Sequence, residues 1–127
     1  MALVPGSLGR AKPWCSDSLD LRVADHGPDA RVITVGGEID TRTAPELAAF
    51  LTAQLATVPL VVLDLDRVQF LGSAGLSVLV SANELATRED RHLRLVCQSV
   101  MVNRVFDVTG LREQFSFADT VSAALES

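Results

Sequence analysis

Residues 64–76 read DLDRVQFLGSAGL and connect a buried strand to a helix. The preceding run, Leu60-Val61-Val62-Leu63, is continuously apolar, which is typical of a central strand covered on both faces. The segment 64–67 is expected to lead into a loop, after which Phe70-Leu71 packs back on the core. Gly72-Ser73-Ala74-Gly75 then opens a helix predicted to extend from about residue 73 to residue 87.

Upstream of this stretch, the pattern predicts a hairpin and a helix. Leu19, Leu21 and Val23 alternate with polar or small residues, as in a half-buried strand. Turn residues at 26–29 precede a β-branched run at 32–35, so the two strands are expected to pair antiparallel, and Gly36-Gly37 is expected to break the second. A helix follows, with Thr43 as its cap, Pro45 in its first turn and Glu46 in capping-box position, and it ends before Pro59.

Downstream, strands and helices continue to alternate. The sequence predicts a strand at 93–96, a helix at 100–108 ended by Gly110, a short strand at 115–117 and a last helix at 121–125 capped by Asp119. The order is two strands followed by three α–β units and a final helix. This order predicts an α/β fold with a mixed sheet, in which right-handed crossovers place helices against the strands.

Length and composition indicate one globular domain. The chain has 127 residues, of which 48% are hydrophobic, and a formal net charge of -5. Pro and Gly without a lasting apolar period mark residues 1–17 as a flexible N-terminal tail, which leaves 18–127 as the domain. The acidic balance argues against nucleic-acid binding, and the apolar runs are too short for membrane insertion. The first residues lack a signal-peptide pattern, which favours the cytoplasm.

No cofactor or metal site is predicted. Cys15 and Cys97 share no metal-ligand spacing and are interpreted as one exposed and one buried thiol, with a redox pair as the alternative. His26 and His92 lie too far apart in the sequence to suggest zinc.

Ser73 is the residue with the clearest chemical potential. It is expected at the N-cap or in the first turn of its helix, where unpaired backbone N–H groups and the helix dipole would stabilise a phosphate on its hydroxyl. The alternative is that Ser73 only caps the helix. A nucleophile elbow is excluded because position 71 is Leu where that motif requires Gly.

Two acidic pairs precede Ser73 in the sequence. Asp64 and Asp66 form a D-x-D pair of the kind that can bind magnesium or accept a phosphoryl group, but a loop cap at Asp64 and a solvated Asp66 are the simpler interpretation. Glu38 and Asp40 lie between a strand and the following helix, either in a solvated turn or in an acidic rim for a basic partner. All four carboxylates are expected near Ser73.

Four short motifs occur in a fixed order from residue 37 to residue 111. They are Gly37-Glu38-Ile39-Asp40, Leu63-Asp64-Leu65, Phe70-Leu71-Gly72-Ser73-Ala74-Gly75-Leu76 and Thr109-Gly110-Leu111. With these motifs, residues 19–125 resemble the STAS domain family, and within it the stand-alone anti-sigma factor antagonists. The resemblance implies the STAS fold, a mixed sheet of about four to five strands packed with about four helices.

The resemblance also implies a regulatory protein and not an enzyme. Members of the family bind an anti-sigma factor that is a serine kinase, and thereby release a sigma factor for transcription; a phosphatase reverses the phosphorylation. By resemblance, Ser73 is the phosphoacceptor, with Ser77 a poorer candidate. The implied partner-binding residues are Glu38, Asp40, Thr41, Gly72, Ser73, Ala74, Gly75 and Ser77.

The signature departs from the family at one position. Gly72 stands where the family has Asp immediately before the serine, which removes a carboxylate beside the phosphoacceptor. If the kinase or its magnesium uses that Asp, phosphorylation of Ser73 is expected to be slow or absent, and the protein then binds constitutively or responds to another input. The alternative function is a STAS regulatory subunit of a transporter or signalling scaffold that is not phosphorylated. A third alternative is an enzyme or a small-ligand binder, for example of a nucleotide near Ser73, but the sequence offers no catalytic constellation.

Overall fold

A computed structural model of the chain describes residues 19–126, and the expected tail at 1–17, with Trp14 and Cys15, lies outside these residues. The elements, in chain order, are β1 (Leu19–Asp25), β2 (Ala30–Ile39), α1 (Ala44–Leu55), β3 (Leu60–Leu71), α2 (Ser73–Arg88), β4 (His92–Val96), α3 (Val100–Thr109), a 3-10 turn (Arg112–Gln114), β5 (Ser116–Ala118) and α4 (Val121–Glu126). The predicted order of strands and helices is confirmed. None of the helices in this part of the chain has the length and apolar character needed to traverse a bilayer.

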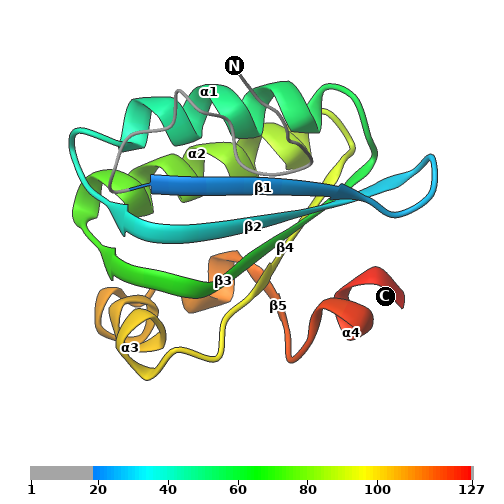
Figure 1. Cartoon of the computed structure of the whole chain (residues 1–127). Helices are drawn as coiled ribbons and strands as arrows, with labels where there is room; N and C mark the ends of the chain where they lie inside the picture. Colours follow the sequence, from blue (N-terminus) through cyan, green and yellow to red (C-terminus); the bar gives the residue numbers. More distant parts are fainter. Residues whose placement is uncertain (1–18, 127) are drawn as a thin grey trace, which may run out of the picture.

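The strands form one sheet whose spatial order follows the chain, β1-β2-β3-β4-β5 (Figure 1). The β1–β2 pair is antiparallel, with Leu21 opposite Val35, and the three remaining pairs are parallel. The hairpin and the mixed sheet predicted from the sequence are therefore confirmed. Parallel neighbours need a crossover, and α1, α2 and α3 provide the three crossovers.

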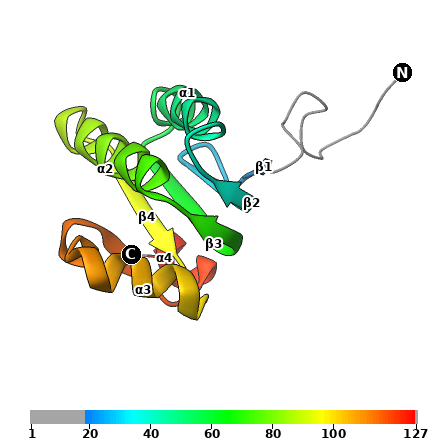
Figure 2. The ribbon, with the colours of Figure 1, turned by 90° about the vertical axis from the view of Figure 1, so that its left-hand side faces the viewer.

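The helices cover both faces of the sheet, as the two perpendicular views show (Figures 1 and 2). Helices α1 and α2 pack side by side on one face, and α3 and α4 lie on the other. The main core includes the fully buried Leu47 of α1, Leu79 of α2 and Phe106 of α3. A smaller cluster under α4 contains Val62, Val96 and Ala124. Burial on both faces explains the apolar run of β3.

Two boundaries predicted from the sequence are wrong. Gly36-Gly37 does not break β2, which continues to Ile39, and β3 continues to Leu71, although residues 64–67 were expected to lead into a loop. The two strands stay paired in parallel because β3 contains two bulges. It has one extra residue opposite the step from Thr34 to Gly36 and another opposite the step from Gly37 to Glu38. Gly37, next to the second bulge, has a φ of 92°, a backbone conformation that glycine adopts without steric strain.

The helix caps also differ in part from expectation. Gly110 ends α3 in the left-handed conformation, as predicted. Thr43 precedes α1 but makes no side-chain cap bond, and the Oε2 atom of Glu46 is buried with no hydrogen-bond partner among the described residues, so no capping box is found there. At α4 the hydroxyl of Thr120, rather than the side chain of Asp119, accepts a hydrogen bond from the N–H of Ala123.

Candidate functional site

The start of α2 is fixed by backbone hydrogen bonds to β2. The N–H of Gly72 donates to the carbonyl oxygen of Ile39 at 2.9 Å, and the N–H of Leu76 donates to the carbonyl oxygen of Gly72 at 3.0 Å. Gly72 is the extended N-cap residue, so Ser73 is the first residue of the helix and its side chain is exposed. The predicted position of Ser73 in the first turn is confirmed.

The first turn of α2 presents backbone donors beside the Ser73 hydroxyl. The first N–H groups of a helix have no intrahelical acceptor, and they carry the positive end of the helix dipole. Because Gly72 has no side chain, no side-chain cap occupies these donors within the described chain. These donors and the dipole can therefore stabilise a negative charge at Ser73.

Close packing holds this helix end against β2. A Cβ atom at Gly75 would lie 2.3 Å from Cγ2 of Ile39 and 2.9 Å from Cδ1 of Leu71, distances that no real side chain tolerates. Gly75 is buried, and its lack of a side chain sets how closely α2 approaches the ends of the strands. The exposed residues of this helix end lie on its other side, at the surface.

Asp40 organises the loop between β2 and α1. Its Oδ1 atom accepts hydrogen bonds from the N–H groups of Arg42 at 2.9 Å and Thr43 at 3.1 Å, and its Oδ2 atom lies 3.4 Å from the Arg42 guanidinium. The buried Thr43 hydroxyl donates to the carbonyl oxygen of Glu38 and accepts from the N–H of Asp40. Desolvation raises the pKa of Asp40, but these hydrogen bonds and the charge of Arg42 outweigh it. The pKa of Asp40 therefore lies below its ordinary value.

The other predicted partner-binding residues lie around the same end of the molecule. Glu38 and Thr41 are exposed on the β2–α1 side, and Ser77 is exposed one turn after Ser73 on α2. Ala74 is half-buried. Glu38 pairs in register with Phe70, and Ile39 with Leu71, so the parallel ladder brings the acidic loop and the start of α2 together.

Phe70 is a surface residue that the sequence interpretation missed. Leu71 is buried as expected, but the ring of Phe70 is 49% exposed and does not pack back on the core. A Cβ at Gly72 would lie 3.0 Å from Cε2 of Phe70, so the ring lies beside the start of α2. The alternation of side chains along a strand, with Leu71 inward, was the signal that Phe70 faces outward.

Asp64 and Asp66 do not join Glu38 and Asp40 at this end. In the middle of β3, Asp64 pairs with Val96, the last residue of β4, and the Oδ1 atom of Asp66 accepts a hydrogen bond from the N–H of Gln98. Asp64 accepts from the N–H of Asp66 at 3.0 Å, which confirms its role as a local cap. Desolvation by burial, with the nearby Asp66 charge, raises the pKa of Asp64.

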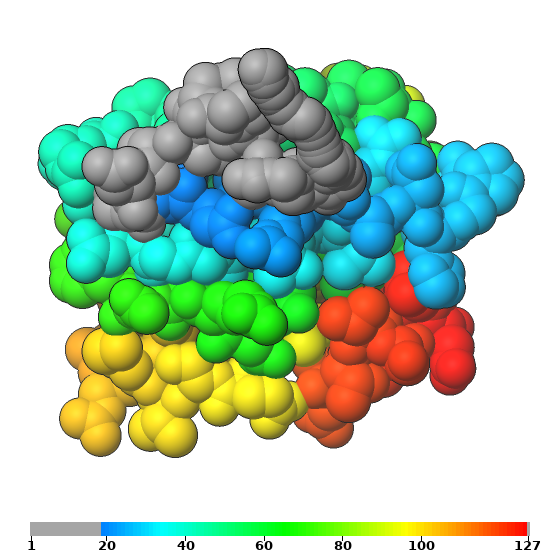
Figure 3. Space-filling model, in the orientation of Figure 1, coloured from blue at the N-terminus to red at the C-terminus, as the bar shows by residue number. Residues whose placement is uncertain are grey.

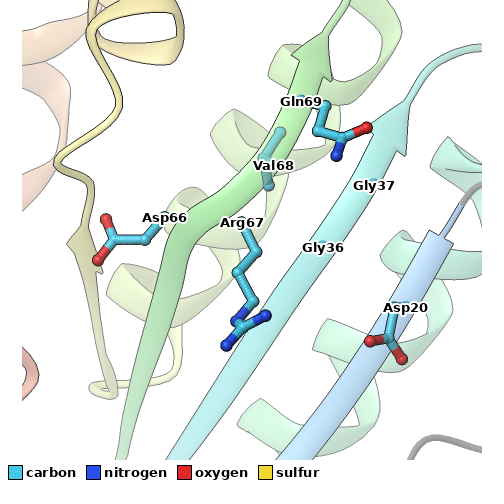
Figure 4. A pocket seen from close by; sticks show the side chains of 7 residues that line it. All are labelled: Asp20, Gly36, Gly37, Asp66, Arg67, Val68 and Gln69. Carbon is cyan, nitrogen blue, oxygen red and sulfur yellow. The ribbon is translucent and has the colours of Figure 1, made fainter.

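A shallow groove of about 380 Å³ lies on the face of β1–β3 turned away from α1 and α2 (Figure 4). It is lined by Asp20, Gly36, Gly37, Asp66, Arg67, Val68 and Gln69. Figure 4 shows the Arg67 side chain reaching over β2, while Asp66 points away toward the segment after β4. In the space-filling view the bands of β2 and β3 reach the surface beside one another (Figure 3). Ser73 is not among the residues that line this groove.

The described residues form no metal site. No group of three or more His, Cys, Asp or Glu side chains that could hold a metal ion occurs in residues 19–126. Cys97 is a buried free thiol, as predicted, and burial raises its pKa, so the thiol stays protonated at neutral pH.

Comparison with known proteins identifies the family. The model of the STAS domain matches residues 22–124, which is most of the chain. The chain belongs to the STAS domain family. The resemblance inferred from the four motifs is confirmed, and the fold is the STAS fold.

Relatives of this chain include anti-sigma factor antagonists. The anti-sigma-F factor antagonist RsfB of Mycobacterium tuberculosis is 34% identical over 110 residues, which cover 86% of this chain and 88% of RsfB. The crystal structure of an anti-sigma factor antagonist from Mycobacterium paratuberculosis has a TM-score of 0.77 and 35% identity, covering 91% of this chain and 96% of that chain. These matches place the protein among the anti-sigma factor antagonists, which are regulatory proteins and not enzymes.

A more distant solved structure extends the likeness of the fold. The Bacillus cell fate determinant SpoIIAA in its phosphorylated form has a TM-score of 0.65 at 18% identity, covering 84% of this chain and 96% of that chain. At this identity the likeness concerns the fold alone.

Proposed function

We propose that this STAS protein binds an anti-sigma factor that is also a serine kinase, and that phosphorylation of Ser73 ends the interaction. The unphosphorylated protein occupies the anti-sigma factor, so the sigma factor is free to direct transcription in the cytoplasm. A serine phosphatase restores the binding-competent form. The relatives named for antagonism of anti-sigma factors support this proposal.

The exposed position of Ser73 as the first residue of α2 is the observation that carries the proposal. A kinase can reach an exposed hydroxyl without unfolding the helix. The dipole and the uncapped N–H groups then stabilise the new charge, so the fold tolerates the modification. A distant relative of the same fold has been solved in phosphorylated form, which is consistent with such tolerance.

Phosphate at Ser73 would weaken partner binding through charge and fit. A phosphoserine carries about -1.5 to -2 charges at neutral pH. It would lie on the same surface as the exposed Glu38, whose neighbour in register is Phe70. A partner surface packed closely on the Ser73 hydroxyl would have to bury the phosphate. A loss of only about 1.4 kcal/mol of binding free energy lowers affinity tenfold.

Phosphate transfer from the cognate anti-sigma kinase tests the site. Radiolabelled ATP should label the wild-type protein and not Ser73→Ala, and Ser77→Ala should be labelled like the wild type. If the wild type takes no label, the protein belongs with the STAS subunits of transporters or scaffolds that are not phosphorylated. Equal labelling of Ser73→Ala would move the phosphoacceptor elsewhere.

Binding to the same anti-sigma factor tests the switch. Ser73→Asp should lose binding by at least about tenfold in a calorimetric titration, because it places a carboxylate where the partner packs. Ser81→Asp is the matched control, since Ser81 is exposed on α2 two turns further along. Unchanged binding by Ser73→Asp, or an equal loss in Ser81→Asp, would refute a switch located at the start of the helix.

A further inference from the structure

Helix α3 displays most of the large apolar side chains that the described chain leaves in solvent. The exposed large hydrophobic residues of the described chain are Val23 at 38%, Phe70 at 49%, Met101 at 54%, Val100 at 77% and Val108 at 78%. Three of these, including the two most exposed, lie on α3. A concentration of exposed apolar side chains on one short helix marks an interaction site more often than scattered single residues do.

These side chains occupy one continuous face. Val102 and Phe106 are fully buried against the core, and the opposite side of the helix carries Val100 and Val108. Because residues four apart lie on one face of a helix, Arg104 lies between these two valines, and Met101 lies beside Arg104. The four residues Val100, Met101, Arg104 and Val108 are called the α3 stripe below. Figure 3 shows the segment of α3 at the molecular surface.

Arg104 gives the α3 stripe a charge at its centre. Within residues 19–126 the Arg104 side chain makes no hydrogen bond or ion pair, and it is exposed. The nearest carboxylate on the helix, Asp107, is already paired with Arg112 at 2.7 Å. The stripe therefore presents an apolar surface with a cation that has no carboxylate of its own in the described chain.

We propose that the α3 stripe docks an amphipathic helix of a protein partner that carries an Asp or Glu at the centre of its apolar face. Valine and methionine side chains contact the partner's apolar residues at helical spacing, and the partner's carboxylate pairs with Arg104. The stripe lies on the face of the sheet opposite α1 and α2, and it shares no residue with the site proposed around Ser73.

Charge argues against two other occupants. A symmetric contact between two copies centred on the stripe would place Arg104 against its own counterpart, and like charges in contact are repulsive. An anionic lipid surface needs clustered cations, whereas the protein has a net charge of -5 and the stripe offers a single arginine. An amphipathic helix with a central carboxylate can both cover the apolar residues of the stripe and pair with Arg104.

A charge-swap titration tests the proposal on the full-length protein. The probes are two synthetic helical peptides with leucines at i, i+3, i+4 and i+7, identical except that the central residue of the leucine face is Glu in one and Lys in the other. We expect the Glu peptide to bind the wild type at least about tenfold more tightly than the Lys peptide. Arg104→Glu should reverse that order, and Val108→Asp should weaken binding of the Glu peptide by at least about tenfold.

The matched control is Arg88→Glu, which reverses a charge at an exposed position on α2 and should leave both affinities unchanged. Because all the substituted side chains are exposed, thermal melts should show the same cooperative unfolding in every variant. Absence of binding by the Glu peptide would overturn the proposal. So would Arg104→Glu and Val108→Asp variants that bind the Glu peptide as tightly as the wild type does.

Three further results would assign the α3 stripe to another occupant and overturn the proposal. The first is a wild-type dimer in sedimentation equilibrium that Val108→Asp abolishes. The second is co-sedimentation of the wild type with phosphatidylglycerol vesicles that Val108→Asp abolishes. The third is a change in the fluorescence of Trp14, the single tryptophan, on introducing Val108→Asp, since it would place residues 1–18 of the same chain on the stripe.

Discussion

Gly75 is the residue on which the geometry of the candidate site most depends. Any side chain there would collide with Ile39 and Leu71, both of which are buried and cannot move into solvent. We therefore expect Gly75→Ala to destabilise the protein by about 1–3 kcal/mol, the usual cost of an added methyl group in a packed interior. Urea unfolding measures this difference.

Ser77→Ala is the matched control for Gly75→Ala. It lies two residues further along the same helix with its side chain in solvent, and alanine has the higher helix propensity. Its free energy of unfolding should stay within about 0.5 kcal/mol of wild type. A Gly75→Ala protein as stable as Ser77→Ala would contradict the close packing of α2 on Ile39.

Gly72 tests what a carboxylate at the N-cap contributes. Aspartate at this position can accept a hydrogen bond from the first turn, whereas alanine cannot. Both substitutions bring a Cβ to 3.0 Å from the ring of Phe70, which is half-exposed and can shift, so their comparison isolates the cap. Gly72→Asp should be about 1 kcal/mol more stable than Gly72→Ala by urea unfolding. Equal stability of the two variants would mean that the first-turn donors do not need a cap.

Asp40 should make stability depend on pH in the acid range. Its folded-state pKa lies below the ordinary value because of the bonds from Arg42 and Thr43, so the folded state binds its proton less readily than the unfolded state. The contribution of Asp40 is thus present above the unfolded pKa and is lost as pH falls through the folded pKa. NMR titration of its carboxyl carbon should give a midpoint below that of a model peptide. A midpoint at or above the peptide value would contradict the bonded loop.

At the scale of elements, the start of α3 provides a cap that the sequence interpretation did not identify. Ser99 is in an extended conformation and its hydroxyl accepts from the N–H of Val102 at 3.3 Å. Removing it in Ser99→Ala should cost about 1 kcal/mol of stability. The matched control is Ser122→Ala on α4, an exposed serine for which no cap bond is found within the described chain. Equal losses in the two variants would show that the cap contributes nothing.

The elements were predictable from sequence where periodicity was strong, and their ends were not. The alternation of Leu19, Leu21 and Val23 and the apolar run at 60–63 predicted strands that the structure confirms. Gly36-Gly37 indicated a break, but hydrogen bonding to β3 on one side and β1 on the other carries β2 through both glycines. Local propensity cannot foresee a pairing that depends on residues thirty positions away in the chain.

The extent of the candidate site depended on the same long-range pairing. The motifs correctly placed Ser73 in the first turn of a helix and indicated the loop with Glu38 and Asp40. They did not reveal that β3 extends seven residues beyond its pairing with β4, which removes Asp64 from the site and leaves Phe70 exposed. The exposure of a side chain at the end of a strand depends on where the neighbouring strands end. The sequence around that side chain does not contain this information.

At the scale of the whole molecule, phosphorylation should leave the fold unchanged. The site lies at one end, and the Gly72–Ile39 hydrogen bond and the buried Gly75 hold it to the strands. We expect amide NMR shifts on phosphorylation of Ser73 to be confined to the first turn of α2 and to residues 38–43, with α3 and α4 unaffected. Ser81→Asp serves as the control for added charge. Shifts spread through α3 would indicate a conformational switch instead.

The strand order has a consequence for how the chain folds. Since β1 to β5 lie in the sheet in the order in which they occur in the sequence, no strand has to insert between two others already paired. During synthesis the hairpin emerges first, and each later strand adds to a single growing edge. The β2, β3 and α2 segments around Ser73 therefore leave the ribosome before the α3 stripe is made, and β5, with three residues, closes the sheet last.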